Sequence, residues 1–245
     1  MEFHPGKCHL LQISNKKNPV NFVYNIHNTA LTKVDSAKYL GVIIDSKLNW
    51  KKQYSSLITS CKQTLSFIRR NLPKAPSKVK EQCYKTLVRP KLEYACPVWD
   101  PYHKIHIDNI EKVQRAAARF VTGNYRMESG NTLINLKNLG WDTLEERRLQ
   151  TKLTIFQKGR LGDIDIPTDH LTLNTRPTRR GRGGLSYQKD FSKVDSYKYS
   201  FYPSTTRLWN QLPSYVKNST KIDHFSKEIK SINITELRRS LQSID

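Results

Sequence analysis

The fold is decided by the stretch Lys38-Tyr39-Leu40-Gly41-Val42-Ile43-Ile44-Asp45, which continues as Ser46-Lys47-Leu48-Asn49-Trp50. From Tyr39 to Ile44 it is a compact apolar run with β-branched residues, which predicts a buried strand or a tight hairpin. Gly41 interrupts the run, and a glycine inside a strand suggests a place where another backbone, or a nucleic acid, comes close. A long helical pattern begins after Trp50. The chain is therefore expected to change from sheet to helix here.

Short strands and turns are expected before this stretch. The runs at 8–13, 22–26 and 31–34 predict strands, and Pro5-Gly6 and His27-Asn28 predict turns. Three or four strands this small cannot bury their faces by themselves. The sheet to which they belong is therefore expected to be incomplete.

Helical periodicity dominates the rest of the chain, so the expected fold is mostly α with a small N-terminal antiparallel β piece. The clearest helix spans 50–72 and ends at Pro73, because proline cannot continue a helix. Further helices are expected over 103–122, 131–139, from 144 onward and over 222–231. Thr143 and Glu146 fit a capping box, and Gly123 fits a helix stop. After 231 the chain is polar and is expected to fray.

The helix that follows Pro76 is less regular. Ser77 is expected to cap it, and Pro90 is expected to kink or split it. Its apolar face is expected to carry Val79, Cys83, Leu87 and Tyr94. Tyr94 and Trp99 are interpreted as core aromatics rather than as platforms for stacked bases. Later in the chain, Ser204 is expected to cap a short helix that stops before Pro213.

The charge of the chain is strongly positive. Lys and Arg number 42 against 21 Asp and Glu, a net charge of +21. A balance this basic points to a polyanionic partner, most simply nucleic acid, although a solubilised surface or a basic structural fold would give the same composition. The expected helix at 50–72 contributes Lys51, Lys52, Lys62, Arg69 and Arg70. These cations form either a solvated helix face or a surface along a duplex backbone.

A second basic segment lies at 175–184 and is rich in glycine. Its arginines suit phosphate contacts with little reading of bases, and a solvated linker is the alternative. They are Arg176, Arg179, Arg180 and Arg182. Aromatic and basic residues then alternate between 187 and 202, as in a base-stacking surface or in a small β-rich piece that folds back on the helices.

Catalytic and metal-binding patterns are not found in the sequence. Polymerase chemistry needs paired carboxylates that hold two metal ions, and Asp45, Asp100 and Asp108 are interpreted as isolated caps or loop acids. The four cysteines are scattered, which argues against a disulfide framework. Neither a membrane-spanning run nor a signal-peptide pattern is present, so the chain is expected to be intracellular, nuclear or cytoplasmic.

Several strings, in order along the chain, resemble one protein family. The run from Lys38 to Trp50 looks like the end of the palm and the start of the thumb in reverse transcriptases of non-LTR (LINE-type, jockey-like) retrotransposons. Family-like strings recur at 84–99, 110–121, 139–148 and 201–213. The last contains Arg207-Leu208-Trp209-Asn210-Gln211-Leu212-Pro213, which resembles the family's terminal R-x-W-N-x-L-P segment.

The resemblance implies roles for individual residues. Tyr39, Leu40 and Gly41 match the primer-grip hairpin. Lys7 matches a lysine near the incoming nucleotide, where it would help to neutralise or protonate the leaving pyrophosphate. The family's Tyr-Ala-Asp-Asp box, whose aspartates bind Mg²⁺ in the intact enzyme, is absent, so Met1 looks like an internal residue of a longer reading frame.

The resemblance also implies a division of the chain and a function. The parts are 1–50, a palm remnant with the primer-grip-like hairpin; 51–160, a helical thumb-like domain; and 161–245, a basic C-terminal region. The partners would be an RNA and DNA template–primer duplex and the missing upstream palm and fingers. This chain would bind nucleic acid, need no cofactor of its own and not polymerise.

Two other interpretations remain open. The chain is also consistent with a helical nucleic-acid-binding or interaction module that has no polymerase role. It is consistent, finally, with the translated remnant of a decayed element that has no function.

Overall fold

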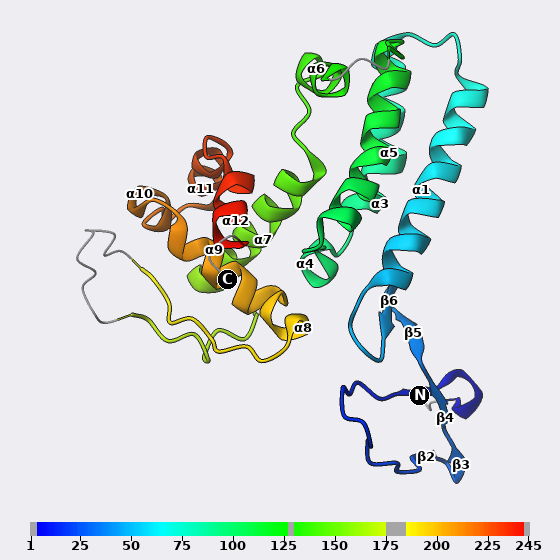
Figure 1. The fold of residues 1–245 in the computed structure, drawn as a ribbon, viewed down its shortest axis with the longest axis vertical. Helices are drawn as coiled ribbons and strands as arrows, with labels where there is room; N and C mark the ends of the chain where they lie inside the picture. Colours follow the sequence, from blue (N-terminus) through cyan, green and yellow to red (C-terminus); the bar gives the residue numbers. More distant parts are fainter. Residues whose placement is uncertain (1–3, 127–129, 175–184, 243–245) are drawn as a thin grey trace. The chain divides into compact units, whose positions relative to one another are not determined.

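The computed structural model describes residues 4–126, 130–174 and 185–242 (Figure 1). The chain divides into two compact units, Met1–Thr59 and Ser60–Asp245, and the division falls inside helix α1 (Lys51–Asn71). Most of the described residues are helical, and the strands found among them, which include two antiparallel pairs, all lie near the N-terminus. The expected fold class is confirmed. The expected division into three parts stays a prediction.

The first unit begins with a 3₁₀ turn and short strand pairs. Strand β1 (His9–Leu11) pairs in parallel with β4 (Thr32–Val34), and β2 (Asn25–Ile26) pairs antiparallel with β3 (Thr29–Ala30). The turn between β2 and β3 has φ of 47° and 61° at its two central residues, as a type I′ hairpin turn requires. The strand expected over 22–26 is shorter than predicted, because only its last two residues pair.

The stretch that opens the sequence analysis is a hairpin. Strand β5 (Ser36–Tyr39) pairs antiparallel with β6 (Val42–Asp45), and Tyr39 faces Val42 across the turn. The turn residues Leu40 and Gly41 have φ of 44° and 83°, so the glycine is explained by the conformation that a two-residue I′ turn needs. Of the two expected alternatives, the tight hairpin is therefore the correct one.

Asp45 links the hairpin to helix α1. Its buried carboxylate accepts hydrogen bonds from the backbone N–H groups of Lys47, Asn49 and Trp50, at 2.9, 3.3 and 3.1 Å. Asn49 in turn accepts from the N–H of Lys51 at 3.0 Å, which satisfies one of the free donors at the start of α1. Of the two expected roles, isolated cap or loop acid, Asp45 fits the loop acid, because it orders the loop that leads into α1.

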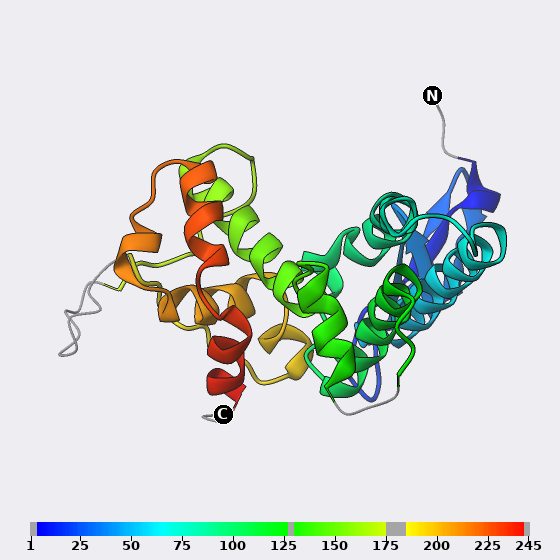
Figure 2. The same ribbon diagram turned by 90° about the horizontal axis from the view of Figure 1, so that it is seen from above.

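The second unit is built of packed helices. In chain order its further elements are α2 (Ser77–Cys83), the π-helical segment η2 (Tyr84–Val88), α3 (Arg89–Glu93), α4 (Cys96–Trp99), α5 (Lys104–Thr122), α6 (Asn131–Asn138), α7 (Leu144–Leu161), α8 (Asp195–Lys198), α9 (Phe201–Gln211), α10 (Ser214–Lys217), α11 (Ile222–Lys230) and α12 (Ile234–Gln242). Seen from above, α9, α11 and α12 lie around α7 (Figure 2).

The helix after Pro76 buries a different face from the one expected. Its core side carries Tyr84, Val88 and Leu92, all nearly inaccessible to solvent. The residues predicted for this face are wrong: Val79, Leu87 and Tyr94 are exposed. The physical reason is that both stripes are apolar, and Tyr84 is fixed on the core side because it donates a hydrogen bond to Gln114 Oε1 at 2.7 Å and stacks on Trp141.

Two further expectations about this region have clear outcomes. Pro90 lies in the first turn of α3, directly after η2, so the helix is interrupted where the proline removes a backbone donor, as predicted. Ser77 is the first residue of α2 rather than its cap, because Pro76 occupies the cap position. Trp99 is fully buried, as predicted, and donates from Nε1 to the carbonyl oxygen of Tyr94 at 2.9 Å.

The helix ends of α5 and α7 agree with the sequence. Gly123 ends α5 with φ of 69°, a conformation that glycine adopts without strain. Thr143 caps α7, and its side-chain oxygen accepts from the N–H of Glu146 at 3.1 Å. The end of α5 and the start of α7 therefore lie where their punctuating residues predict.

The C-terminal helices form a second apolar core with α7. It centres on Trp209, which is fully buried between Phe156 and Phe225 and donates from Nε1 to the carbonyl oxygen of Leu185 at 2.7 Å. Ser204 lies inside α9 and not at its cap, which is Ser200. The expected fraying after 231 is also wrong, because Ile234 at the start of α12 is fully buried.

A buried ion cluster ties α12 to α7 and to the end of α4. The Asp100 carboxylate lies 3.0 Å from Arg148 Nε, 3.4 Å from Lys152 Nζ and 3.4 Å from Arg238 Nη1. Asp100 is therefore not the isolated loop acid that the sequence suggested. Burial by itself would raise the pKa of Asp100, but the three cations outweigh burial and lower that pKa to about 2.

Candidate nucleic-acid interface

The exposed face of α1 is basic and carries five cations. Lys51, Lys52, Lys62, Arg69 and Arg70 are all exposed. At about 100° per residue, Lys51, Lys62 and Arg69 lie within about 20° of one another around the helix axis, and Lys52 and Arg70 lie about 100° further round. The core residues Tyr54, Cys61, Leu65 and Ile68 lie about 40–100° from Lys51 in the direction opposite to Lys52 and Arg70.

No carboxylate interrupts this face. Helix α1 contains no Asp or Glu, and the exposed positions between its cations are mainly hydroxyl residues, such as Ser55, Thr59 and Ser66. Within the described part of the chain, none of the five cations forms a salt bridge. The face therefore combines positive charge with small hydroxyl donors, both of which bind phosphate oxygens.

Two of the cations have local partners that orient them. Lys52 Nζ donates to Ser36 Oγ at 2.9 Å, and the Arg69 guanidinium lies 5.9 Å from the ring centroid of Tyr125. Neither partner is an acid. Both side chains therefore keep their positive charge uncompensated while their positions are restricted.

The length of the face suits a nucleic-acid backbone. From Lys51 to Arg70 the helix rises about 28 Å at 1.5 Å per residue, and Figure 1 shows α1 as one uninterrupted helix. A duplex of that length carries roughly 16 phosphate charges. Five cations at this spacing can each reach a different phosphate without distorting the helix.

Strand β6 of the hairpin is anchored to the first turn of α1. The side chain of Gln53 is buried, and its Oε1 accepts from the backbone N–H of Ile43 at 2.9 Å. Beyond this anchor Tyr39 and Leu40, at the end of the hairpin, are 66% and 73% exposed. An exposed aromatic side chain can stack on a base.

The other predicted site residues are distributed as follows. Lys7 lies in the 3₁₀ turn η1 (Pro5–Lys7) and is exposed on the first unit. Tyr39, Leu40 and Gly41 form the exposed end of the hairpin, whose strands contact the start of α1 at Ser36 and Ile43. The four arginines predicted at 176, 179, 180 and 182 lie outside the described residues. The nucleic-acid role of all these residues remains a prediction.

Sequence reasoning missed the residues of the buried ion cluster. Arg148 and Lys152 are four residues apart on α7, a spacing that places them on one helix face, but the same pattern is typical of a solvated surface. Asp100 follows a buried tryptophan. A single acid directly after an apolar run was the one feature of the sequence that could have indicated that Asp100 is buried. Arg238 had no signal, because the segment that carries it was expected to fray.

Metal and membrane sites are absent from the part of the chain that the structure describes. There, no three or more His, Cys, Asp and Glu side chains are grouped so that they could hold a metal ion. Nor does any described helix combine the length and apolarity needed to cross a bilayer.

Comparison with known proteins finds a distant relative. Over 101 residues, 40% of this chain, the sequence is 27% identical to the probable RNA-directed DNA polymerase from transposon X-element of Drosophila melanogaster. The aligned part is 11% of that protein, so this chain corresponds to a small portion of it. No family model matches the chain, and no solved structure matches it. The chain is therefore related, distantly and in part, to a transposon-encoded RNA-directed DNA polymerase.

Proposed function

We propose that this chain corresponds to the end of the palm, the thumb and the C-terminal region of a LINE-type reverse transcriptase, and that it binds a template–primer duplex without polymerising. The single observation that supports the binding role best is the acid-free outward face of α1, with its five exposed cations. A solvated helix normally mixes both signs of charge, whereas a surface that binds phosphates does not.

The fold is consistent with this assignment element by element. The hairpin β5–β6, with its exposed tip, is the proposed primer-grip-like element. The helices from α1 to α7 are the proposed thumb, and the helices after α7 are the proposed C-terminal region. The distant similarity to the transposon polymerase supports the same assignment.

Catalysis is not part of the proposal for this chain. Nucleotide transfer of this type needs two metal ions held by paired carboxylates. Asp100, a buried acid of the second unit, is instead an ion-pair partner. We expect no incorporation of labelled nucleotide by the purified chain with Mg²⁺ and a primed template, and template-dependent incorporation would overturn this part of the proposal.

The binding role is tested by measuring affinity as a function of salt. Fluorescence anisotropy with a labelled RNA/DNA hybrid gives the slope of log K against log salt concentration. The variant Lys62→Gln/Arg69→Gln/Arg70→Gln removes three proposed phosphate contacts, so the slope should become shallower by about 2.7. All three side chains are exposed, so the fold should be retained.

A matched control uses three exposed lysines on or beside α11. Lys221→Gln/Lys227→Gln/Lys230→Gln makes the same change in net charge away from α1. Its slope should stay near that of the unmodified chain. Equal losses in both variants would mean that only net charge matters, and salt-independent or absent binding by the unmodified chain would favour an interaction module with no polymerase role.

A further inference from the structure

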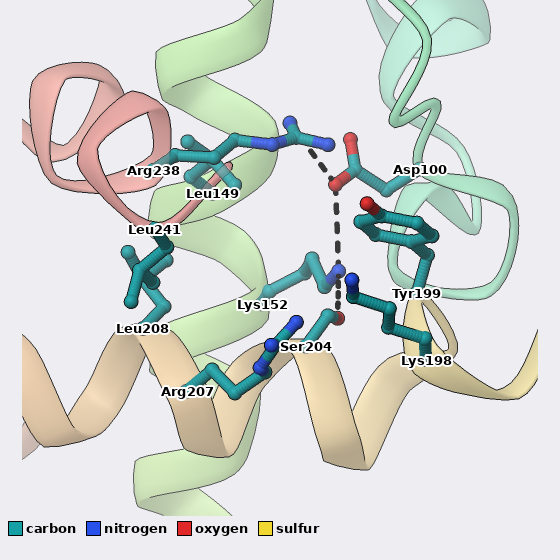
Figure 3. A pocket seen from close by; sticks show the side chains of 10 residues that line it. All are labelled: Asp100, Leu149, Lys152, Lys198, Tyr199, Ser204, Arg207, Leu208, Arg238 and Leu241. Carbon is teal, nitrogen blue, oxygen red and sulfur yellow. Dashed lines mark hydrogen bonds and ion pairs between the residues drawn. The ribbon is translucent and has the colours of Figure 1, made fainter. Parts of the chain in front are cut away.

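A small cavity lies beside the buried ion cluster, between α7, α8, α9 and α12 (Figure 3). Its volume is about 40 Å³. One water needs roughly 10–15 Å³ on this measure, so the cavity holds about three water-sized groups, the size of a single phosphate group. All the residues that line it belong to the second unit.

The cavity wall is rich in cations. Lys152, Lys198, Arg207 and Arg238 line it, and Asp100 is the acid among its lining residues. Figure 3 shows the side chains of Lys152, Lys198 and Arg207 converging on the region of the Ser204 hydroxyl. Such a set supplies several N–H donors to one small volume, as an oxyanion site requires.

The cations of the cavity wall outnumber its acids. Asp100 is shared among Arg148, Lys152 and Arg238, and Glu145 Oε1 lies 3.4 Å from Arg238 Nη1. With the buried Glu111, whose charge acts on Arg148, these acids match the three cations of the cluster itself. Lys198 and Arg207 add two further positive charges to the wall of the adjoining cavity, so an anion that enters it is favoured.

Buried donors beside the cluster also remain unused. The Nη1 and Nη2 atoms of Arg148 are inaccessible to solvent, and among the described residues neither has a hydrogen-bond partner. Its Nε alone is engaged, by Asp100. Arg148 is not among the residues that line the cavity, so these atoms add positive charge near the cavity rather than contacts inside it.

We infer that this cavity binds one phosphate-sized oxyanion, held by Lys152, Lys198, Arg207 and Arg238, with the Ser204 hydroxyl positioning Lys152. Ser204 Oγ accepts from Lys152 Nζ at 2.7 Å and donates to the carbonyl oxygen of Ser200 at 2.6 Å, so the lysine is already placed at the cavity wall. The phosphate comes either from solution or from the terminal monoester of an oligonucleotide, since both present the same group. The site is separate from the face of α1.

The direct test is binding of inorganic phosphate by the full chain. Isothermal calorimetry and thermal unfolding should show saturable one-site binding of phosphate and a rise in melting temperature, relative to chloride at the same ionic strength. The variant Lys198→Gln/Arg207→Gln, which leaves the buried Asp100 pairs in place, should bind at least about tenfold more weakly, because two charged hydrogen-bond donors are lost. The control Lys189→Gln/Lys193→Gln changes two exposed lysines outside the cavity and should bind normally.

Two further measurements identify the source of the phosphate and separate phosphate binding at the cavity from nucleic-acid binding at α1. An oligonucleotide with a 5′-phosphate should displace inorganic phosphate, and the same oligonucleotide without it should not, if the ligand is a strand terminus. If both fail to displace it, the ligand is free phosphate. The Lys62→Gln/Arg69→Gln/Arg70→Gln variant should keep phosphate binding even if it loses the hybrid.

The inference is wrong if the unmodified chain responds to phosphate as it does to chloride, or if the cavity variant binds phosphate as tightly as the control. Near-ultraviolet circular dichroism checks that the cavity variant is folded. If it is not, Ser204→Ala replaces it, because this change removes one hydroxyl and no charge. Because Ser204 Oγ accepts from Lys152 Nζ, Ser204→Ala should weaken phosphate binding by releasing this lysine, and a phosphate affinity equal to that of the unmodified chain would contradict the site as inferred.

Discussion

Replacing Asp100 by asparagine should destabilise the second unit strongly. The change keeps the shape of the side chain and one acceptor oxygen but removes the negative charge that faces Arg148, Lys152 and Arg238 at 3.0–3.4 Å. Removing one partner of a buried ion pair typically costs about 3–5 kcal/mol, because the remaining charges stay buried. We expect a loss of about 3 kcal/mol, which for a unit of this size lowers the melting temperature by roughly 6–12 °C.

The pKa of Asp100 gives a second, independent value for the contribution of its charge to stability. Despite burial, which acts to raise it, the three cations lower this pKa from its ordinary 3.8 to about 2. At about 1.4 kcal/mol per pH unit, the shift corresponds to roughly 2 kcal/mol of stability. Because the folded pKa lies below the unfolded one, this contribution is complete above about pH 5 and is lost as the pH falls through about 2. Asp100→Asn should lack this acid dependence.

Lys152 modifies the result at high pH. Burial lowers the pKa of Lys152 and outweighs the opposing effect of Asp100. Without the aspartate this pKa should fall further, so that the folded variant loses the lysine proton before the unfolded chain does. The free energy of unfolding of Asp100→Asn should then rise with pH in the range below the ordinary lysine pKa. The difference in stability between this variant and the unmodified chain should become smaller in that range.

Urea unfolding followed by near-ultraviolet circular dichroism measures these differences, since the buried Trp99 and Trp209 report on the second unit. Asp163→Asn, an exposed acid, serves as the control and should change stability by less than about 0.5 kcal/mol. If Asp100→Asn matches that control at pH 7, or keeps the acid dependence of the unmodified chain, the cluster is not the electrostatic anchor argued above.

Two smaller changes test local packing. Thr143→Ala removes the side chain that caps α7 and should cost about 1 kcal/mol in urea unfolding, while Thr143→Ser should cost little; equal stability of all three proteins would contradict the cap. A Cβ added at Gly159 would overlap the side chain of Ile166, so Gly159→Ala should destabilise the chain by about 1–3 kcal/mol although alanine favours helix. Gly159→Ala/Ile166→Ala should recover part of that loss, and a Gly159→Ala protein more stable than the unmodified chain would refute the contact.

Local rules of sequence predicted the elements well where one residue decides the outcome. Helix α1 has a single apolar stripe without internal proline or glycine, so its length and buried side followed from periodicity. Gly123 and Thr143 mark helix ends through their own backbone or side chain. The turn at Leu40 and Gly41 could also be predicted from the sequence, because a glycine between two apolar runs favours a hairpin.

The remaining features depend on contacts between distant segments. Around Tyr84 two neighbouring stripes are both apolar, and only the hydrogen bond to Gln114 and the stacking on Trp141 decide which one is buried. The ion cluster joins Asp100 to Arg238, which lies 138 positions later in the chain. No local pattern distinguishes such buried charges from solvated ones, and this is why the cluster and its cavity were not predicted.

The ion pairs of the second unit bear on how its positive charge acts. Glu81 pairs with Lys85, Glu93 pairs with Arg147, and Asp100 is shared by three cations; none of these partners lies on α1. Each pair neutralises charge inside the helical unit, while α1 has no acid of its own to do so. The five cations of α1 are a part of the net charge of +21, but they lie on one helix without an acid among them, and a field of one sign steers a polyanion. If the charge served solubility alone, moving it from α1 to α11 at constant net charge would leave hybrid binding unchanged; we expect that exchange to abolish most of it.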